Sequence, residues 1–311
     1  MNIKPIIIVP GEIKSIFFEI FFKSLKIKRY KSPLILICNY GHLNSQKKKF
    51  NFKKKFELTN IKSLKNKKLS NKIIYVIDVK MNNSSKYIKK CFEISFNLLK
   101  NNLSHKLING PINKKKTLNK RYLGVTEYIA RKFNKKKIAM LIYNKKLSVS
   151  PLTTHLPLKL VANKISKNLI IEKIKLIDSF YQKFFRLKPV IGITGLNPHC
   201  ESILKFNEDE KIIKPTVKLL KNKKFRVEGP FAADTIFLKK NRSKFHIILG
   251  MYHDQVLTPL KTIFEYDAIN ITIGLPFLRV SPDHGPNEKM FGKNKSNPES
   301  LINALNFLDN K

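Results

Sequence analysis

Three short segments of the sequence place a histidine beside turn-forming residues. They are Pro151-Leu-Thr-Thr-His155-Leu-Pro157, Gly195-Leu-Asn-Pro-His199 and Gly250-Met-Tyr-His253-Asp-Gln255, and each follows a predicted strand. Imidazole is the commonest protein ligand of transition metals, and three neutral imidazoles can hold one divalent ion with a position left open for substrate. The spacings carry no local signature, and a chain with seven histidines always offers triples. From the residues alone, three unrelated loop histidines therefore remain the alternative.

Residues suited to binding an anion lie towards the C-terminal end. Lys261, Asn270 and Arg279 are evenly spaced, and Arg279 follows the apolar turn Gly274-Leu-Pro-Phe-Leu278. Lysine and arginine suit a phosphate or a carboxylate, and the guanidinium group offers two parallel donors. Because the chain has 62 Lys and Arg residues, a solvated surface position is the alternative for any one lysine. An arginine in an apolar context is less easily explained in that way.

Glycine-rich nucleotide-binding motifs are absent from the sequence. No GxGxxG follows the first predicted strand, and no GxxxxGK[ST] occurs anywhere in the chain. The first pattern marks a Rossmann dinucleotide site and the second a P-loop. A nicotinamide cofactor would therefore bind through a different loop architecture, and the sequence assigns no residue to it.

Short β-branched runs alternate with amphipathic segments, which predicts an α/β fold with parallel strands buried on both faces. The predicted strands are Lys4 to Val9, Pro33 to Cys38, Lys72 to Asp78, Lys106 to Asn109, Lys137 to Tyr143, Val190 to Thr194, Phe245 to Leu249 and Ala268 to Thr272. The predicted helices are Ser15 to Lys26, Ser85 to Asn101, Thr126 to Phe133, Pro157 to Asp178 and Pro298 to Leu308. Gln46 to Lys68 is the most linker-like segment. In such folds ligands bind beyond the carboxyl ends of the strands, where the chemically informative residues fall.

The chain of 311 residues is long enough for one large or two medium domains, and it is strongly basic. A net charge of +41 first suggests nucleic acid or an anionic membrane as a partner. The basic residues are mostly lysines in short runs spread along the whole chain, and Ala and Gly are scarce. That distribution is typical of a genome biased towards A and T. We therefore expect no specific nucleic-acid partner, although a functional anion-attracting surface remains the alternative.

The cysteines and the N-terminal segment indicate a soluble protein of a reducing compartment. Three cysteines without CxxC spacing argue against a disulfide framework and against a structural zinc site. The first apolar run is short and is followed by Pro10 and Gly11, so it predicts a buried strand rather than a signal peptide or a membrane span. We expect a cytoplasmic protein with no membrane association.

Eight segments together resemble the 4-hydroxythreonine-4-phosphate dehydrogenase family of vitamin B6 biosynthesis. They are Asn109 to Lys114, Gly124 to Glu127, Thr153 to Pro157, Gly195 to His199, Gly229 to Thr235, Tyr252 to Gln255, Asn270 to Pro276 and Asp283 to Gly285. They occur in the order of the family and span nearly the whole chain. Any one of them is weak, but eight in register are highly specific.

The resemblance implies an NAD- or NADP-dependent oxidation of 4-hydroxythreonine 4-phosphate to a 2-amino-3-oxo acid. Loss of carbon dioxide then gives 3-amino-2-oxopropyl phosphate. One divalent metal per subunit, Zn²⁺, Mg²⁺ or Co²⁺, is implied to be held by His155, His199 and His253. A metal at the substrate hydroxyl lowers the pKa of that hydroxyl as hydride leaves.

The substrate contacts of the family map onto Thr126, Lys261, Asn270 and Arg279. Asp254 and Asp234 are candidates for supporting the metal ligands, although for Asp254 a solvent-facing role is an equal alternative. The resemblance also implies a homodimer whose active site borrows residues from both subunits.

The implied fold consists of two α/β/α domains like those of isocitrate and isopropylmalate dehydrogenases, with the active-site cleft between them. We expect residues 1–125 together with 265–311 to form the first domain and residues 126–264 to form the second.

Three departures from the family pattern keep alternatives open. A turn rich in Gly and Pro is replaced by Gly11-Glu-Ile-Lys-Ser-Ile-Phe-Phe-Glu19, a substrate-binding histidine by Val125, and several glycines by Cys200-Glu-Ser-Ile-Leu-Lys205. Glycines allow a close approach of the backbone to a ligand. The alternatives are a relative that acts on threonate or erythronate phosphate, a degenerate enzyme without activity, and a basic nucleic-acid-binding protein.

Overall fold

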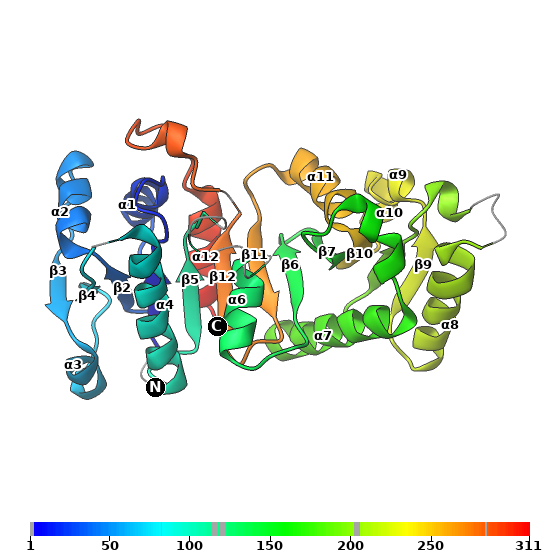
Figure 1. Ribbon diagram of the computed structural model, residues 1–311, viewed down its shortest axis with the longest axis horizontal. Helices are drawn as coiled ribbons and strands as arrows, with labels where there is room; N and C mark the ends of the chain where they lie inside the picture. Colours follow the sequence, from blue (N-terminus) through cyan, green and yellow to red (C-terminus); the bar gives the residue numbers. More distant parts are fainter. Residues whose placement is uncertain are drawn as a thin grey trace. The chain divides into compact units, whose positions relative to one another are not determined.

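The computed structural model describes residues 3–81, 83–113, 117, 122, 124–201, 206–283 and 285–311. The chain divides into two compact units (Figure 1): unit 1 comprises residues 1–133 and 275–311, and unit 2 comprises residues 134–274. The expected domain boundaries lie slightly earlier at both crossings. Helix α6 (Val125–Lys132) belongs to unit 1 because its Tyr128 and Ile129 are part of that unit's core. Strand β11 (Ile269–Ile273) belongs to unit 2 because it pairs with β6 (Ala139–Tyr143).

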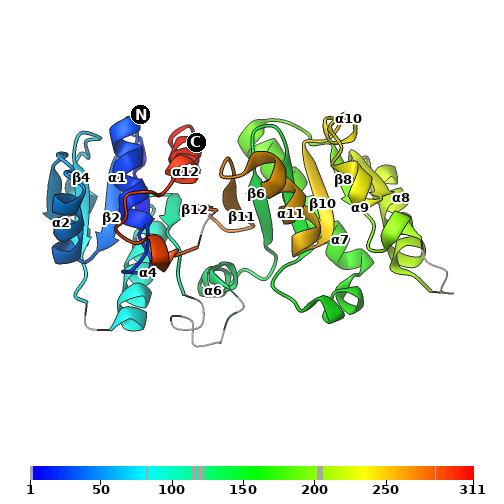
Figure 2. The same ribbon diagram turned by 90° about the horizontal axis from the view of Figure 1, so that it is seen from above.

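Unit 1 is built on parallel strands in the order β3-β4-β2-β1-β5-β12. The strands are β1 (Ile6–Val9), β2 (Leu34–Cys38), β3 (Phe56–Thr59), β4 (Ile74–Asp78), β5 (Lys106–Asn109) and β12 (Leu278–Pro282). Besides α6, its helices are α1 (Phe17–Ile27), α2 (Tyr40–Lys49), α3 (Ile61–Asn66), α4 (Ser84–Lys100), the 3-10 turn η5 (Glu288–Met290) and α12 (Glu299–Asp309). Helices α1 and α12 lie on one face of the strands and α4 on the other (Figure 2). Strands β1, β2 and β4 are nearly continuous apolar runs, as expected where helices cover both faces of a sheet.

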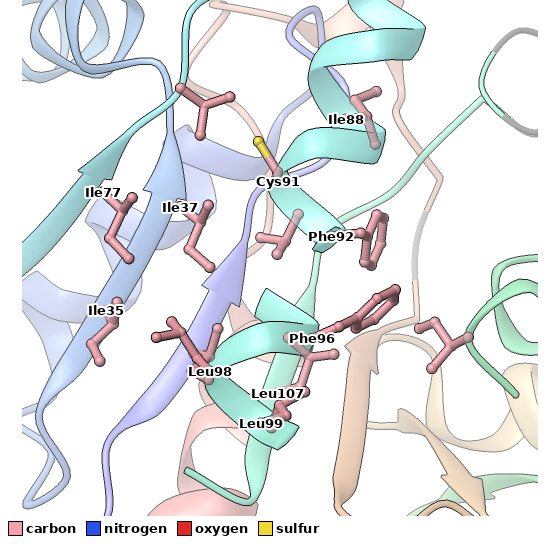
Figure 3. Packing of buried hydrophobic residues seen from close by; sticks show 14 of the residues in the cluster. Ile35, Ile37, Ile77, Ile88, Cys91, Phe92, Phe96, Leu98, Leu99 and Leu107 are labelled. Atoms are coloured by element: carbon pink, nitrogen blue, oxygen red, sulfur yellow. The ribbon is translucent and has the colours of Figure 1, made fainter. Parts of the chain in front are cut away.

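In the core beneath α4, alternate residues of the strands pack against one face of the helix. Figure 3 shows Ile35, Ile37, Ile77 and Leu107 from the strands facing α4, which contributes Ile88, Cys91, Phe92, Phe96, Leu98 and Leu99. Strand side chains on one face recur every two residues, and helix side chains on one face recur every three or four. Burying each such side chain stabilises the fold by about 1.5–3 kcal/mol. All three cysteines of the chain lie in the described part and are unbridged, as the sequence predicts.

Phenylalanines stand in α1 where the family resemblance implies a turn with glycine and proline. Phe17 and Phe18 are 0% and 6% exposed. Phe17 stacks on Phe21 and Phe18 on Phe22, while Phe22 stacks on Phe52. Aromatic pairs at such spacings stabilise the fold by about 0.5–1.5 kcal/mol, in addition to the stabilisation from the apolar area that they bury. The departure from the family pattern therefore builds core at this position.

Unit 2 is a mixed sheet in the order β11-β6-β7-β10-β8-β9. Its further strands are β7 (Ser148–Thr153), β8 (Ile191–Thr194), β9 (Val227–Phe231) and β10 (Ile247–Tyr252). Its helices and turns are η1 (Leu158–Leu160), η2 (Ala162–Lys164), α7 (Lys167–Phe185), η3 (Pro198–Cys200), the π-helical η4 (Asp209–Ile213), α8 (Lys214–Asn222), α9 (Ala233–Ile236), α10 (Lys239–Arg242) and α11 (His253–Phe264). Strands β7, β10, β8 and β9 are mutually parallel, whereas β6 is antiparallel to both of its neighbours. The expectation of parallel strands throughout was therefore wrong for β6, because a short turn joins it to β7.

Each strand predicted from the sequence is present, and β1 confirms the prediction of a buried N-terminal strand. Four strands were not predicted. Three of them contain proline or glycine, namely β7, β9 and β12. The fourth, β3, lies in the lysine-rich segment taken as linker-like. Helix α7 begins later than predicted, since Pro157 is followed by two 3-10 turns. No helix in the described part of the chain combines the length and the apolar character needed to cross a membrane.

Candidate active site

The three predicted metal ligands follow the carboxyl ends of three neighbouring parallel strands of unit 2. His155 follows β7, His199 follows β8, and His253 is the first residue after β10. Strand β10 lies between the other two, with Tyr252 opposite Thr153 and Leu249 opposite Ile193. Because parallel strands end at one edge of a sheet, all three turns lie along the same edge.

Two of these histidines lie side by side. The ring centroids of His155 and His253 are 6.1 Å apart, with an angle of 34° between the rings. His199 is exposed on η3. Within the described ranges, no three His, Cys, Asp or Glu side chains are grouped closely enough to hold an ion. The single chain thus brings together two of the three predicted ligands.

Asp254 contacts the neighbouring histidine through its side chain. Its Oδ1 is 2.7 Å from Nδ1 of His253, and the Asp254 side chain is 81% exposed. An ionised carboxylate can only accept a hydrogen bond, so it favours the tautomer with a proton on Nδ1. The lone pair of Nε2 is then available to a metal ion, as in the carboxylate–histidine pairs of metal sites.

The turns that carry His155 and His199 adopt a strained backbone conformation. The φ angles of His155, His199 and Cys200 are 35°, 55° and 61°. L-residues visit this region rarely, and each such residue costs about 1–3 kcal/mol, so it persists only where its surroundings hold it there. Strained positions cluster at functional sites, and here two of the three coincide with predicted ligands.

Asp234 lies on α9, beyond the carboxyl end of β9, and is exposed. Burial raises the pKa of the Cys200 thiol, and the negative charges of Asp209 and Asp234 raise it further. Asp234 is therefore close to the turn of His199, although no hydrogen bond from it to a predicted ligand is seen among the described residues.

Arg279 is the most deeply buried of the predicted substrate-binding residues. It lies on β12 of unit 1 and is 3% exposed. Its Nε donates to Oδ1 of Asn109 at 2.7 Å and its Nη1 to Oγ1 of Thr126 at 3.4 Å. Burial lowers the pKa of Arg279 to about 10, an effect that the charge of Glu127 opposes. The guanidinium group therefore remains positively charged near neutral pH.

The other two predicted substrate-binding residues lie in unit 2. Lys261 is exposed on α11, and Asn270 lies on β11 opposite Ile142. Oδ1 of Asn270 is buried and, within the part of the chain that the structure describes, accepts no hydrogen bond. A buried polar atom of this kind calls for a partner that a ligand can supply.

Two of the sequence departures have a visible structural counterpart. Val125, at the position where the resemblance implies a histidine, packs against the apolar core of unit 1. Gly11 keeps a φ of +86°, and a Cβ there would lie 2.2 Å from the carbonyl oxygen of Pro111. Most of the Cys200 to Lys205 segment, together with Lys114 and His284 of the family motifs, lies outside the described residues.

Three buried polar residues at these turns were not selected from the sequence. Asn109, Gln255 and Asp209 are 2%, 9% and 0% exposed and each hydrogen-bonds near a predicted site residue. Asn109 and Gln255 lie inside family motifs, so the motifs carried a signal for them. Asp209 lies outside every quoted motif, and only the fold brings it to the turn of His199.

The family model for "Pyridoxal phosphate biosynthetic protein PdxA" matches residues 26–308. A 4-hydroxythreonine-4-phosphate dehydrogenase of Sulfurihydrogenibium sp. is 42% identical over 241 residues, which cover 75% of this chain and 74% of that protein. A D-threonate 4-phosphate dehydrogenase of Pectobacterium atrosepticum is 34% identical over 204 residues, which cover 65% and 63%. The sequence relatives thus include enzymes named for two substrates.

Solved structures agree with the fold expected from the sequence. The 4-hydroxythreonine-4-phosphate dehydrogenase of Klebsiella pneumoniae superposes with a TM-score of 0.84 at 26% identity, covering 100% of both chains. An isocitrate dehydrogenase of Methylococcus capsulatus shares the fold at a TM-score of 0.52 and 12% identity, covering 97% of this chain and 84% of that one. The chain belongs to the family of the pyridoxal phosphate biosynthetic protein PdxA.

Proposed function

We propose that this protein oxidises 4-hydroxythreonine 4-phosphate with NAD or NADP. The product is the 2-amino-3-oxo acid, which loses carbon dioxide to give 3-amino-2-oxopropyl phosphate for pyridoxal phosphate biosynthesis. The observation that carries the proposal is the row of histidine turns along one sheet edge, in a chain 42% identical to an enzyme of that name. A bound nicotinamide cofactor would supply the hydride acceptor, and the task of the protein would be to orient the reactants.

His155, His199 and His253 are the proposed ligands of one divalent metal ion. The pairing of His155 with His253, and the contact of Asp254 with Nδ1 of His253, fit two imidazole ligands. The exposed His199, or the same residue of a second subunit, supplies the third. Imidazole donors favour Zn²⁺ or Co²⁺ over Mg²⁺, which prefers oxygen. When bound, the ion supplies Lewis-acid chemistry that lowers the pKa of the substrate hydroxyl.

Arg279, Thr126, Lys261 and Asn270 are the proposed substrate-binding residues. Arg279 is charged, and Asn109 and Thr126 accept hydrogen bonds from its Nε and Nη1, so the guanidinium group is held in a fixed orientation. A preorganised guanidinium group loses little entropy when it binds a phosphate or carboxylate. The buried Oδ1 of Asn270 can accept a hydrogen bond from a hydroxyl or ammonium group of the substrate. Asp254 orients His253, and Asp234 is proposed to support the turn of His199.

A homodimer with the active site at the subunit interface is part of the proposal. It is supported by the grouping of only two predicted ligands within the described part of one chain. A cytoplasmic location is proposed from the biosynthetic role and the unbridged cysteines.

D-Threonate 4-phosphate is the second candidate substrate. The Pectobacterium atrosepticum relative bears that name, and Val125 stands where the family resemblance implies a histidine. The two substrates differ at the second carbon, which carries an amino group in one and a hydroxyl group in the other. An apolar side chain removes one polar contact to the substrate and leaves that choice to other residues.

The test is cofactor reduction by the purified protein with each phosphorylated acid, using NAD and NADP in turn. The proposal predicts that the ratio of kcat to KM is at least tenfold higher for 4-hydroxythreonine 4-phosphate than for D-threonate 4-phosphate. The reverse preference would establish the second candidate. Cofactor reduction with neither acid would refute both.

A further inference from the structure

The side chain of Gln255 links the turns of two predicted ligands. Its Oε1 accepts from the backbone N–H of Met251 at 2.7 Å and from Oγ1 of Thr194 at 2.8 Å. Its Nε2 donates to the carbonyl oxygen of Gly195 at 2.8 Å. One amide group therefore ties the end of β10, which leads to His253, to the end of β8, which leads to His199.

Thr153 extends this network to the turn of His155. Its Oγ1 donates to the carbonyl oxygen of Met251 at 2.8 Å, and the residue is 5% exposed. Met251 thus receives a hydrogen bond at its carbonyl from β7 and gives one from its N–H to Gln255. Since His155 and His253 each lie two residues beyond these points, a shift of Met251 displaces both imidazoles together.

Asp209 fixes the turn of His199 from the other side. Its Oδ1 accepts from the N–H of Leu196 at 2.8 Å, and its Oδ2 accepts from the N–H of Asn197 at 3.0 Å and from Nδ2 of Asn197 at 2.9 Å. A charged acceptor makes stronger hydrogen bonds than a neutral one, and more so away from water. These bonds hold the backbone immediately before the strained His199.

Two glycines make room for this network. A Cβ on Gly195 would lie 2.6 Å from Oδ1 of Asp209, and a Cβ on Gly250 would lie 2.3 Å from Cγ1 of Val256 and 3.0 Å from Oε1 of Gln255. The absence of a side chain at both positions lets the buried polar groups approach the strand ends. The two glycines thus leave space for the side chains that hydrogen-bond the backbone close to the histidines.

We propose that Gln255 and Asp209 are positioning residues that hold the turns of His155, His199 and His253 in register for metal binding. The inference rests on the metal site of the proposed function. Neither side chain touches the ion; both act through the backbone that carries the ligands. Outer hydrogen bonds of metal sites change metal affinity by about 10–100-fold when removed.

The test uses the full-length protein and Co²⁺, whose absorption spectrum reports the ligand geometry. Gln255→Glu replaces the donor to Gly195 by a carboxylate oxygen, and Asp209→Asn removes the charge and places an amide donor opposite an N–H. Both substitutions keep the side-chain shape. We expect each to weaken Co²⁺ binding by about 10–100-fold and to alter the spectrum of the bound ion.

The matched control is Tyr181→Phe. Tyr181 is 4% exposed, and its hydroxyl donates to Ser148 at 2.9 Å at the start of β7, which is the opposite end of the same strand. We expect this variant to lose a buried hydrogen bond without any change in Co²⁺ affinity. If Tyr181→Phe and Gln255→Glu weaken Co²⁺ binding equally, the cause is general destabilisation of the protein, and the inference is wrong.

Thr153→Val and His253→Ala complete the experiment. Thr153→Val removes only the link to Met251, so it tests the network if Gln255→Glu does not fold. Unchanged Co²⁺ affinity in Thr153→Val would count against the inference.

His253→Ala tests the metal site itself, because a parent protein that binds Co²⁺ no better than this variant refutes the proposed function. In that case hydrogen exchange at the amides of Leu196, Asn197 and Met251 still decides the positioning role. Faster exchange in Gln255→Glu and Asp209→Asn supports that role, and unchanged exchange contradicts it.

Discussion

Arg279 combines burial with a retained positive charge, and this is the strongest residue-scale sign of a binding site for an anion. Its burial favours the neutral form, yet its lowered pKa of about 10 keeps the guanidinium ionised. Asn109 and Thr126 accept two of its hydrogen bonds, so the fork has a fixed direction. A buried cation is expensive unless opposite charge lies near it; Glu127 supplies such charge, and a bound phosphate or carboxylate would offset more of the cost.

Arg279→Lys tests this role at the level of one side chain. Lysine keeps the charge but loses the planar fork, so a charge-assisted hydrogen bond of about 1.5–3 kcal/mol is lost. We expect kcat/KM to fall by roughly ten- to hundredfold. The control is Lys218→Ala, since Lys218 is exposed on α8. Values within about twofold of the parent for both variants would make Arg279 a structural residue only.

Lys54 shows that the sequence alone does not distinguish a solvated lysine from one with a structural contact. Its Nζ donates to the carbonyl oxygen of Asn71 at 3.0 Å, and burial lowers its pKa. The sequence predicted the histidine turns because they lie in family motifs, although strand β7, which leads to His155, was not predicted. Gln255 and Asp209 could not be assigned a role in the same way, since their partners are backbone groups of turns distant in sequence.

At the scale of elements, the close approach of the turn after β1 to the turn after β5 depends on glycine. A Cβ on Gly110 would lie 2.0 Å from the carbonyl oxygen of Pro10, which is backbone and must move. We expect Gly110→Ala to lower the free energy of unfolding by about 1–3 kcal/mol, measured by urea denaturation. Gly41→Ala is the control because the nearest atom to its Cβ, Oδ1 of Asn39, is 3.4 Å away. If Gly110→Ala is as stable as Gly41→Ala, the turns are not tightly packed.

The junction of α1 and α2 gives a second prediction at this scale, through His42. Its ring lies 5.5 Å from that of Phe18, and burial lowers its pKa, an effect that a hydrogen bond to the backbone of Ile13 opposes. Above the ordinary histidine pKa of about 6.5, His42 is neutral in both folded and unfolded states. As the pH falls below that value, the unfolded chain takes up a proton before the folded protein does, so stability is lost.

His42→Gln removes this titration and keeps a donor for the backbone of Ile13. Urea unfolding above and below pH of about 6.5 should show a smaller loss of stability on acidification in the variant than in the parent. Other titrating groups act equally in both proteins, so the difference isolates His42. Identical pH dependence in the two proteins would show that the native pKa is not lowered.

The elements that the sequence predicted are those whose pattern is local. Continuous apolar runs predicted β1, β2 and β4, and amphipathic stretches predicted α4 and α12. Strand β3 was not recognised because it lies in a lysine-rich segment, and its conformation depends on pairing with β4. The antiparallel direction of β6 was missed because apolar content does not encode strand direction.

At the scale of the whole molecule, the net charge of +41 opposes formation of the proposed dimer. Like charges repel two copies of the chain, and salt screens that repulsion over about 8–10 Å at physiological ionic strength. Sedimentation at physiological salt should nevertheless give a species of twice the 36.2 kDa chain mass. A monomer under these conditions would refute the dimer and would remove the second subunit as a source of metal ligands. Dissociation only at low salt would agree with the account.

The most direct test of the central claim measures two products in one reaction. The purified protein is given 4-hydroxythreonine 4-phosphate and NAD, and both reduced cofactor and released carbon dioxide are quantified, before and after treatment with a chelator. The account predicts equal amounts of the two products, loss of both on chelation, and their return when Zn²⁺ or Co²⁺ is restored to the parent protein but not to His253→Ala. Reduced cofactor that forms at the same rate after chelation, or equally well in His253→Ala, would contradict it.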